Sequence, residues 1–334
     1  MNQREIAKLA GVSSATISRV INNDPSVSEE TRKHVQEIIE KYSYVTNVNA
    51  RNLRMSRSKT IGFLISNFNN PFFVAIYQGM EKVCSEKGYN IIIGITNEKT
   101  EQQKKAIDLF LSYQVSGIIG SFVDLDEPSL KKLKGMKKNV ILLDRQIKGI
   151  DADTIEIDNE GGAVQQVNYL AELGHRKIAV IHGKKDSPGA SRLEGFYQGM
   201  KRRGILVHPE YVICGNYNER DAYYAAVQLL QLPDPPTAII AHNNLMCIGA
   251  YKAIRDLGKK IPADVSLIGF DNFDFASYLE PGITLIDRPV DQMGEMAAKM
   301  IFERLEYTYT GEARRIVLPV RLKISESCGA NFRK

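Results

Sequence analysis

The sequence has no apolar run that approaches the roughly 18 residues of a membrane-spanning helix, and this absence excludes a helical membrane protein. Residues 1–11 lack the apolar core and the small-residue cleavage site of a secretory signal, so we expect the chain to stay in the cytoplasm. The four cysteines are scattered and form no C-x-x-C pair, which argues against a zinc site and against a disulfide framework. We therefore expect no metal, no other cofactor and no membrane partner.

The composition indicates a globular protein with more than one folding unit. A chain of 334 residues exceeds the usual size of one hydrophobic core, and 43% hydrophobic with 25% charged residues is typical of soluble proteins. Residues 1–59 hold ten Lys or Arg against six Asp or Glu, so they carry +4 of the formal net charge of +5. An isolated basic segment favours a polyanionic partner such as nucleic acid, although a charge cluster is more often a solvated face.

The first fifty residues predict a module of three short helices. The first apolar helical pattern ends at Gly11, Ser13 is placed to cap a second helix, and Ser28 is placed to cap a third. On periodicity alone, a helical bundle that caps a larger domain explains this segment equally well. The second helix has an apolar side and a small, polar and basic side, the latter formed by Ala15, Ser18, Arg19 and Asn22.

The second of these helices carries a specific motif. Residues 10–22 read Ala-Gly-Val-Ser-Ser-Ala-Thr-Ile-Ser-Arg-Val-Ile-Asn, followed by Val27-Ser28 and Thr31-Arg32. This pattern closely resembles the helix-turn-helix of the lactose-repressor and galactose-repressor (LacI/GalR) family of bacterial transcription regulators. The resemblance implies a DNA-binding domain over residues 1–46, with residues 14–22 as the recognition helix in the major groove.

The resemblance also implies roles for individual side chains of this helix. Ser14, Ala15 and Arg19 match the base-reading positions of the family, and the guanidinium group of Arg19 suits a bidentate contact with guanine. Neighbouring hydroxyl and amide groups would bond phosphates and position the helix. The predicted DNA contacts of this segment are Ser13, Ser14, Ala15, Thr16, Ser18, Arg19 and Asn22.

Residues 47–59 follow as a basic segment. Alone they are too short for a stable helix, and a basic linker is the simpler interpretation. The Asn-x-x-Ala-Arg-x-Leu pattern of residues 47–53, however, is similar to the family's hinge helix, which orders when two subunits meet on DNA. This implies that Leu53 enters the minor groove and bends the duplex, and that Arg51 and Arg54 lie beside phosphates.

From residue 60 onward, short apolar strands alternate with longer amphipathic helices, which predicts parallel sheets covered on both faces. The sequence Tyr-Gln-Gly-Met occurs at residues 77–80 and again at 197–200, each time in the first helix after a strand. Two doubly wound α/β lobes in tandem explain this repeat. The clearest predicted strands are 61–65, 91–95, 115–120, 140–143, 178–182, 238–241 and 265–270.

A two-lobed α/β body behind a helix-turn-helix is the architecture of the same family, which in this part resembles periplasmic sugar-binding proteins. The family topology implies that residues 60–334 form one lobe from about 60–158 plus 288–318. The other lobe then contains about 159–287 plus 319–334. In such folds a ligand binds at the carboxyl ends of the strands, in the cleft between the lobes.

The segments that follow the strands match family motifs and imply a ring of effector contacts. An aromatic face would stack on the ligand, and polar side chains from both lobes would bond it. The interpretation that competes for each charged residue is an interlobe or surface salt bridge. The implied effector contacts are Phe72, Phe73, Asp144, Arg145, Arg192, Asn244, Asp271 and Arg288.

Two positions depart from the family pattern. Asn244 and Arg288 stand where many members have Asp and Gln, so each change makes the cleft more positive by one charge. Together with Arg145 and Arg192 they suggest an anionic effector, a sugar acid or sugar phosphate rather than a neutral sugar, since guanidinium groups suit carboxylate and phosphate.

An enzyme is the less favoured alternative. Residues 189–193 lack the second glycine of a nucleophile elbow, residues 183–185 lack the rest of a phosphate loop, and the five histidines are dispersed. A sugar-binding protein with a purely structural helical head is the other alternative. We expect a non-enzymatic homodimeric regulator, a repressor of carbohydrate-catabolism genes that binds a palindromic operator and associates with the nucleoid there. The sequence leaves a protein corepressor open.

Overall fold

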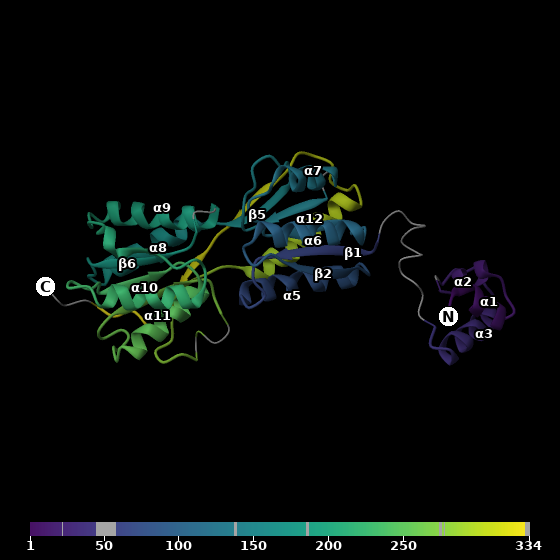
Figure 1. The fold of residues 1–334 in the computed structure, drawn as a ribbon, viewed down its shortest axis with the longest axis horizontal. Coiled ribbons are helices and arrows are strands. Elements are labelled where there is room, and N and C mark those ends of the chain that lie inside the picture. The colour runs from purple at the N-terminus through teal and green to yellow at the C-terminus, as the bar shows by residue number, and fades with distance from the viewer. Residues whose placement is uncertain are drawn as a thin grey trace. The chain divides into compact units, whose positions relative to one another are not determined.

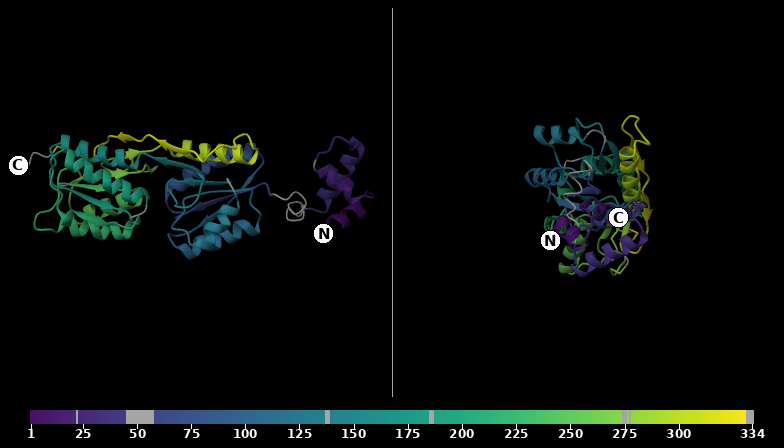
Figure 2. Two further views of the ribbon diagram at one scale, coloured as in Figure 1. Left: turned by 90° about the horizontal axis from the view of Figure 1, so that it is seen from above. Right: turned by 90° about the vertical axis from the view of Figure 1, so that its right-hand side faces the viewer.

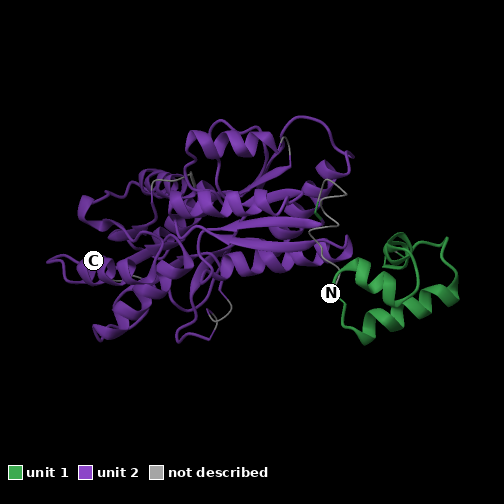
Figure 3. Ribbon diagram, turned by 45° about the vertical axis from the view of Figure 1, so that its right-hand side comes forward, with its two compact units in different colours: residues 1–58 green, residues 59–334 purple. Residues whose placement is uncertain are grey.

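The computed structural model of the protein describes residues 1–21, 23–44, 58–136, 139–184, 187–273, 276 and 278–330. The chain forms two compact units, residues 1–58 and residues 59–334 (Figure 3). Each unit has a hydrophobic core of its own, as the length of the chain predicts.

The first unit contains the three predicted helices, and two predicted caps are confirmed. The Ser13 hydroxyl accepts a hydrogen bond from the Thr16 amide at 3.1 Å, and the Ser28 hydroxyl accepts one from the Thr31 amide at 3.3 Å. Gly11 follows the first helix with a φ of 64°, a conformation that a side chain disfavours. The helices are α1 (Gln3–Leu9), α2 (Ser14–Ile21) and α3 (Glu29–Lys41), around a core of Ile6, Ala7, Ala10, Ile17, Val20 and Val35.

The second unit contains two six-stranded sheets (Figure 1). The first sheet has the strand order β11-β5-β4-β3-β1-β2 and is parallel throughout; with its helices it forms what we call the first lobe. Its elements are β1 (Thr60–Ile65), α5 (Pro71–Glu86), β2 (Asn90–Ile95), α6 (Thr100–Ser112), β3 (Gly117–Gly120), α7 (Glu127–Gly135), β4 (Val140–Leu143), β5 (Asp153–Ile157), α12 (Val290–Leu305) and β11 (Arg315–Leu318).

The second sheet has the order β12-β10-β9-β8-β6-β7 and, with its helices, forms the second lobe. Its pairs are parallel except for β10 with β12, which is antiparallel, so the prediction of wholly parallel sheets is wrong at this edge. Its elements are α8 (Asn159–Glu172), β6 (Ile178–His182), α9 (Ser187–Arg202), the 3₁₀ turn η1 (Pro209–Tyr211), β7 (Val212–Cys214), α10 (Glu219–Leu230), β8 (Ala238–Ala241), α11 (Asn244–Asp256), β9 (Ser266–Phe270), β10 (Thr284–Asp287) and β12 (Arg321–Lys323).

Helices cover both faces of each sheet. Because successive side chains of a strand point to opposite faces, neighbouring residues pack against different helices. In β1, Phe63 packs in the cluster of α5 and α12, whereas the neighbouring Leu64 packs in the cluster of α6 and α7. In the second lobe, Ile239 faces α10 and α11, and Ile240 faces α8 and α9. No helix in the described ranges is long and apolar enough to cross a membrane.

The repeated Tyr-Gln-Gly-Met motif has the same packing role in both lobes. A Cβ atom added at Gly79 of α5 would lie 2.4 Å from the backbone oxygen of Asp291 in α12, and one at Gly199 of α9 would lie 2.8 Å from Val167 in α8. The methionine that follows each glycine is buried. The motif therefore marks close helix pairs on the two sheets.

The chain crosses between the lobes after β5, after β10 and after β11. Figure 2 shows the C-terminal part of the chain, in yellow, running along both lobes. The predicted strands are confirmed with ends shifted by no more than two residues, but β5, β7, β10, β11 and β12 were not predicted.

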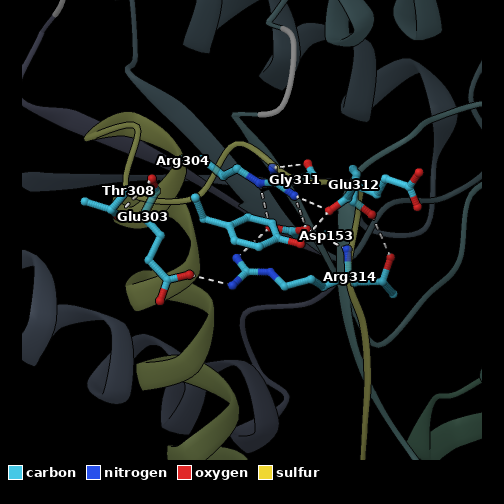
Figure 4. A network of polar contacts seen from close by, with 10 residues as sticks. Asp153, Glu303, Arg304, Thr308, Gly311, Glu312 and Arg314 are labelled. Atoms are coloured by element: carbon cyan, nitrogen blue, oxygen red, sulfur yellow. Dashed lines mark hydrogen bonds and ion pairs between the residues drawn. The ribbon is translucent and has the colours of Figure 1, made fainter.

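Strand β5 was missed because it carries buried charge. The Asp153 carboxylate is 1% exposed and accepts hydrogen bonds from the guanidinium groups of Arg304, at 2.9 and 2.7 Å, and Arg314, at 2.9 Å (Figure 4). Arg304 also donates to the carbonyl oxygens of Gly311 and Glu312, at 2.8 Å each. This network joins the segment after α12 to β5, the strand next to the edge strand β11.

Candidate DNA-binding helix and interlobe cavity

Helix α2 separates its buried and exposed side chains cleanly. Ile17 and Val20 are buried in the core of the first unit, whereas Ser14, Ala15 and Arg19, the predicted base-reading residues, are exposed. The side-chain amide of Gln3 donates to the backbone oxygen of Ser14 at 2.9 Å and so joins α1 to the start of α2. The side of α2 that faces solvent is therefore the side that the sequence assigned to DNA.

Three further predicted DNA contacts lie at the start of α2 or on its half-buried side. Ser13 and Thr16 hold the start of the helix, since their hydroxyl oxygens lie 2.9 Å apart, and Ser18 is half-buried. Predicted contacts outside the described residues are Asn22, Arg51, Leu53 and Arg54.

A cavity of about 440 Å³ lies between the two lobes of the second unit. Its wall contains residues that follow β1, β2 and β4 in the first lobe, and β6, β7 and β9 in the second. The carboxyl ends of the strands thus meet there, as the doubly wound fold predicts. The predicted effector contacts that line it are Phe72, Phe73, Asp144, Arg145, Arg192, Asp271 and Arg288.

Residues other than glycine with a left-handed backbone conformation cluster at this cavity. Such residues are uncommon outside glycine, cost about 1–2 kcal/mol each and concentrate at functional sites. In each lobe they come at the ends of an edge strand and of an inner strand, β2 and β4 in the first and β7 and β9 in the second. The residues are Asn97 (φ 48°), Glu98 (58°), Asp144 (64°), Asn216 (51°), Tyr217 (57°) and Asp271 (71°).

Arg288 joins carboxylates of both lobes. Its Nη1 atom donates to Oδ1 of Asp144 in the first lobe at 2.9 Å, and its Nε atom lies 2.9 Å from Oδ1 of Asp271 in the second. Its guanidinium carbon is 3.6 Å from the ring centroid of Phe72, a cation–π contact. Phe73 meets the Phe72 ring edge-on, with centroids 4.8 Å apart.

Arg192 is held within the second lobe. Its Nε atom donates to Oδ1 of Asn159 at 2.7 Å, and its Nη1 atom donates to the backbone oxygen of His242. Its Nη2 atom lies 3.6 Å from Oδ1 of Asp271, and its guanidinium group stacks on Phe270, 3.9 Å from the ring centroid. Asp271 therefore lies between two arginines.

Arg145 makes the other arginine–carboxylate pair of the wall. It donates from Nη1 and Nη2 to the two carboxylate oxygens of Glu98, at 3.0 and 2.8 Å, in a bidentate pair within the first lobe. Its guanidinium carbon lies 5.9 Å from the ring centroid of Tyr217, which belongs to the second lobe. Neither Glu98 nor Tyr217 was predicted, although both follow the ends of edge strands.

Asn244 is fully buried and is not part of the cavity wall. Its side-chain amide donates to Oδ1 of Asn70 at 2.9 Å, which makes a hydrogen bond between the lobes, and its Oδ1 accepts from the Leu245 amide at 2.8 Å. The structure thus gives Asn244 an interlobe contact, the role that competed with effector binding for the polar residues of the cleft.

The wall does not have the expected surplus of positive charge. Its basic residues Arg145, Lys184, Arg192 and Arg288 are matched by as many acidic ones, and the three arginines each contact a carboxylate. The acidic residues of the wall are Glu98, Asp144, Asp221 and Asp271.

His242 lies immediately after β8 and is fully buried. Burial, followed by the nearby charges of Arg192 and His182, holds the pKa of its imidazole well below the ordinary value of 6.5. His242 is not part of the cavity wall. Among the described residues, no group of three or more His, Cys, Asp or Glu side chains is arranged to hold a metal ion.

Comparison with known proteins agrees with both units. Residues 3–47 match the bacterial regulatory proteins of the lacI family, and residues 167–328 match the periplasmic binding protein-like domain. The HTH-type transcriptional repressor CytR of Escherichia coli (strain K12) is 32% identical over 317 residues, which cover 94% of this chain and 92% of that repressor.

Solved structures give the same result over nearly the full length. The transcriptional regulator CelR in complex with cellobiose is 28% identical with a TM-score of 0.74, and the match covers 98% of this chain and 99% of that one. The lac repressor dimer bound to operator and the anti-inducer ONPF is 25% identical with a TM-score of 0.83, covering 99% of both chains. With its helix-turn-helix, its two-lobed body and these relatives, the chain belongs to the lacI family of bacterial regulatory proteins and is a DNA-binding transcriptional regulator.

Proposed function

We propose that the protein is a homodimeric repressor that binds a palindromic operator at carbohydrate-catabolism genes and responds to a small sugar-like effector. Helix α2 carries the DNA-binding part: Ile17 and Val20 fix its inner side, while Ser14, Ala15 and Arg19 face solvent. Readout in the major groove requires a fixed helix whose polar side chains are exposed to the base edges. The operator-bound dimer of the lac repressor supports the assembly.

The DNA-binding part extends beyond α2 in this proposal. Residues 1–46 form the helix-turn-helix domain, with Ser13, Thr16, Ser18 and Asn22 at phosphates or at the start of the recognition helix. In this proposal residues 47–59 are the hinge, Leu53 enters the minor groove, and Arg51 and Arg54 lie beside phosphates. The family match at residues 3–47 supports the first of these assignments.

The effector site in this proposal is the interlobe cavity. Its volume of about 440 Å³ falls within the roughly 300–1,000 Å³ of small-molecule sites. Amide, carboxylate and guanidinium groups on its wall suit hydroxyl groups, and the cellobiose complex of CelR supports a sugar. Because charges on the wall balance, they give no preference for a sugar acid or sugar phosphate over a neutral sugar.

The effector acts by changing how the lobes meet. Only a ligand whose affinity differs between two arrangements of the lobes can shift the protein from one to the other. The wall draws residues from both lobes, so a bound molecule contacts both and fulfils this condition. A cytoplasmic regulator without enzymatic activity fits the repressor relatives best.

The test of this function is a selection of genomic DNA fragments by the purified full chain at near-physiological salt. Enrichment of one palindrome upstream of a few operons is the expected result, and the enzymes encoded there nominate effectors. The absence of any enrichment would mean either that binding requires an effector or a partner, or that the helical head is only structural and the ligand-binding body is the function.

Arg19 provides the sharper test of how α2 docks. Arg19→Ala should lose roughly 1–3 kcal/mol of discrimination at one base pair in each half-site, because it removes a bidentate donor to guanine. Arg202→Ala, an exposed arginine of α9, removes the same charge far along the chain and should leave the site preference unchanged. An Arg19 variant that selects the wild-type site at every position contradicts this docking.

A further inference from the structure

Arg288 is a buried charge placed where the chain passes from one lobe to the other. It lies between the last residue of β10 in the second sheet and α12, which packs on the first. Only 3% of its side chain is exposed. A buried guanidinium group is tolerated when carboxylates and hydrogen bonds compensate its lost hydration. Asp144 of one lobe accepts a hydrogen bond from Arg288, and Asp271 of the other lobe forms an ion pair with it.

The same contacts use groups that a sugar would need. Carboxylates accept hydrogen bonds from sugar hydroxyls, and an aromatic face stacks on the apolar face of a sugar ring. In this cavity the guanidinium group of Arg288 covers the face of Phe72, at 3.6 Å, and contacts one carboxylate of each lobe, at 2.9 Å. A neutral sugar ring has access to the Phe72 face only if Arg288 leaves it.

We propose that Arg288 is an internal ligand of the cavity and sets its specificity. Its guanidinium group takes the position of an effector between Phe72, Asp144 and Asp271, joins the lobes without any added molecule, and excludes neutral sugar rings from that part. This inference rests on the proposed function, because it takes the cavity to be the effector site. An effector that binds with Arg288 in place contacts the remaining wall, which includes Glu98, Lys184, Asn216 and Tyr217.

The proposal distinguishes Arg288 from the other arginines of the cavity. Arg145 pairs with a carboxylate of its own lobe, and the hydrogen bonds and ion pair of Arg192 also lie within one lobe. Among the ion pairs between described residues, those of Arg288 include a carboxylate of each lobe. Replacing it should therefore change both the separation of the lobes and the choice of ligand.

The experiment uses the full chain with Arg288→Gln, which removes the charge but keeps a long polar side chain. The matched control is Arg321→Gln, which removes an arginine paired with Asp287 at 2.9 Å on the surface, where its side chain is 80% exposed. Small-angle X-ray scattering without ligand should show lobes that lie farther apart in Arg288→Gln than in wild type, and the wild-type curve in Arg321→Gln. Calorimetry with D-ribose, D-glucose and D-galactose should show at least one sugar binding about tenfold or more tightly to Arg288→Gln than to wild type, a change of about 1.4 kcal/mol.

A scattering curve of Arg288→Gln identical to wild type would overturn the interlobe role, and unchanged affinity for all three sugars would overturn the specificity role. If Arg288→Gln does not fold, Arg288→Ala is assayed with guanidinium chloride at millimolar concentration. Guanidinium should then raise its melting temperature, whereas sodium chloride at equal ionic strength should not; equal effects of the two salts would overturn the proposal. Operator binding is measured separately, so a wild-type chain that selects no DNA counts against the proposed repressor function and leaves these scattering results standing.

Discussion

His242 is a buried residue whose ionisation should be visible in the stability of the whole protein. Within the described part of the chain, neither of its ring nitrogens has a hydrogen-bond partner. Burial first, and the charges of Arg192 and His182 second, lower the pKa of this imidazole in the folded protein. In the unfolded chain the pKa returns to about 6.5, so the unfolded state takes up the proton first as the pH falls.

The stability that neutral His242 contributes is therefore complete above about pH 6.5 and is lost as the pH falls toward the folded-state pKa. In His242→Leu the free energy of unfolding should fall less steeply with decreasing pH, by about 1.4 kcal/mol per pH unit, because one proton fewer is taken up on unfolding. Urea unfolding at a series of pH values between about 7 and 5 measures the slope. The exposed His34→Gln is the control and should keep the wild-type slope; an equally steep slope in His242→Leu contradicts the assignment. His175, whose pKa is also lowered chiefly by burial, accounts for a remaining slope.

Single residues of the cavity were predictable where a strand end determines their place. Asp144, Arg145 and Asp271 follow β4 and β9 directly, and the doubly wound fold brings such ends together. Their partners were not predictable. The contact between Arg288 and Asp144 joins residues 144 positions apart, and no local pattern specifies it.

At the scale of elements, β5 depends on charges that come from the far end of the chain. Burial alone would raise the pKa of the Asp153 carboxyl, but hydrogen bonds from Arg304 and Arg314 outweigh it and leave this pKa below the ordinary 3.8. Asp153→Asn should cost about 3–5 kcal/mol, because it leaves the buried guanidinium group of Arg304 and the half-buried one of Arg314 without their carboxylate. Urea unfolding of the full chain measures this loss.

The control for Asp153 is Glu306→Gln, which breaks an ion pair with Lys87 at 2.7 Å in which both side chains are 46% exposed. Such a surface pair contributes at most about 1 kcal/mol. Since the folded-state pKa of Asp153 is depressed, its contribution is present above about pH 3.8 and is lost as the pH falls through the folded-state value. If both substitutions lower the free energy of unfolding equally, the buried network stabilises the protein no more than a surface ion pair does.

The strands that the sequence did not predict are those whose pattern depends on distant partners. Strand β5 has only two apolar residues, and its Asp153 and Glu156 are buried beside arginines of α12, of β11 and of the segment before β11. Strands β11 and β12 carry exposed arginines and lie at sheet edges. The strands that were found have apolar runs, which need no such partner.

At the scale of the whole molecule, polar and apolar contacts between side chains join the lobes. The Arg288 ion pairs, the contact of Arg145 with Tyr217 and the hydrogen bond from Asn244 to Asn70 lie at or behind the cavity. The family resemblance predicted that two lobes enclose a site, but it could not say which side chains connect them. Since these polar contacts join the two lobes directly, removing one should have a measurable effect on the arrangement of the lobes.

Asn244 allows the effect of one such contact to be measured with an isosteric change. Asn244→Asp keeps the oxygen that accepts from the Leu245 amide but loses the donor to Oδ1 of Asn70. Asn70 cannot reverse the bond at no cost, because the same oxygen accepts from the Phe72 amide at 3.0 Å and caps α5. The loss of one buried hydrogen bond, about 1 kcal/mol, should lower the ratio of closed to open lobes roughly fivefold.

Fluorescence energy transfer between dyes on the two lobes measures this ratio in the ligand-free full chain. The matched control is Asn243→Asp, the same substitution one residue earlier, where the side-chain oxygen only caps α11 by accepting from the Met246 amide at 2.8 Å. Aspartate is as good an N-cap as asparagine, so this variant should transfer energy as the wild type does. If both variants shift the signal equally, the negative charge at the start of α11 is the cause, and the hydrogen bond between Asn244 and Asn70 does not hold the lobes together.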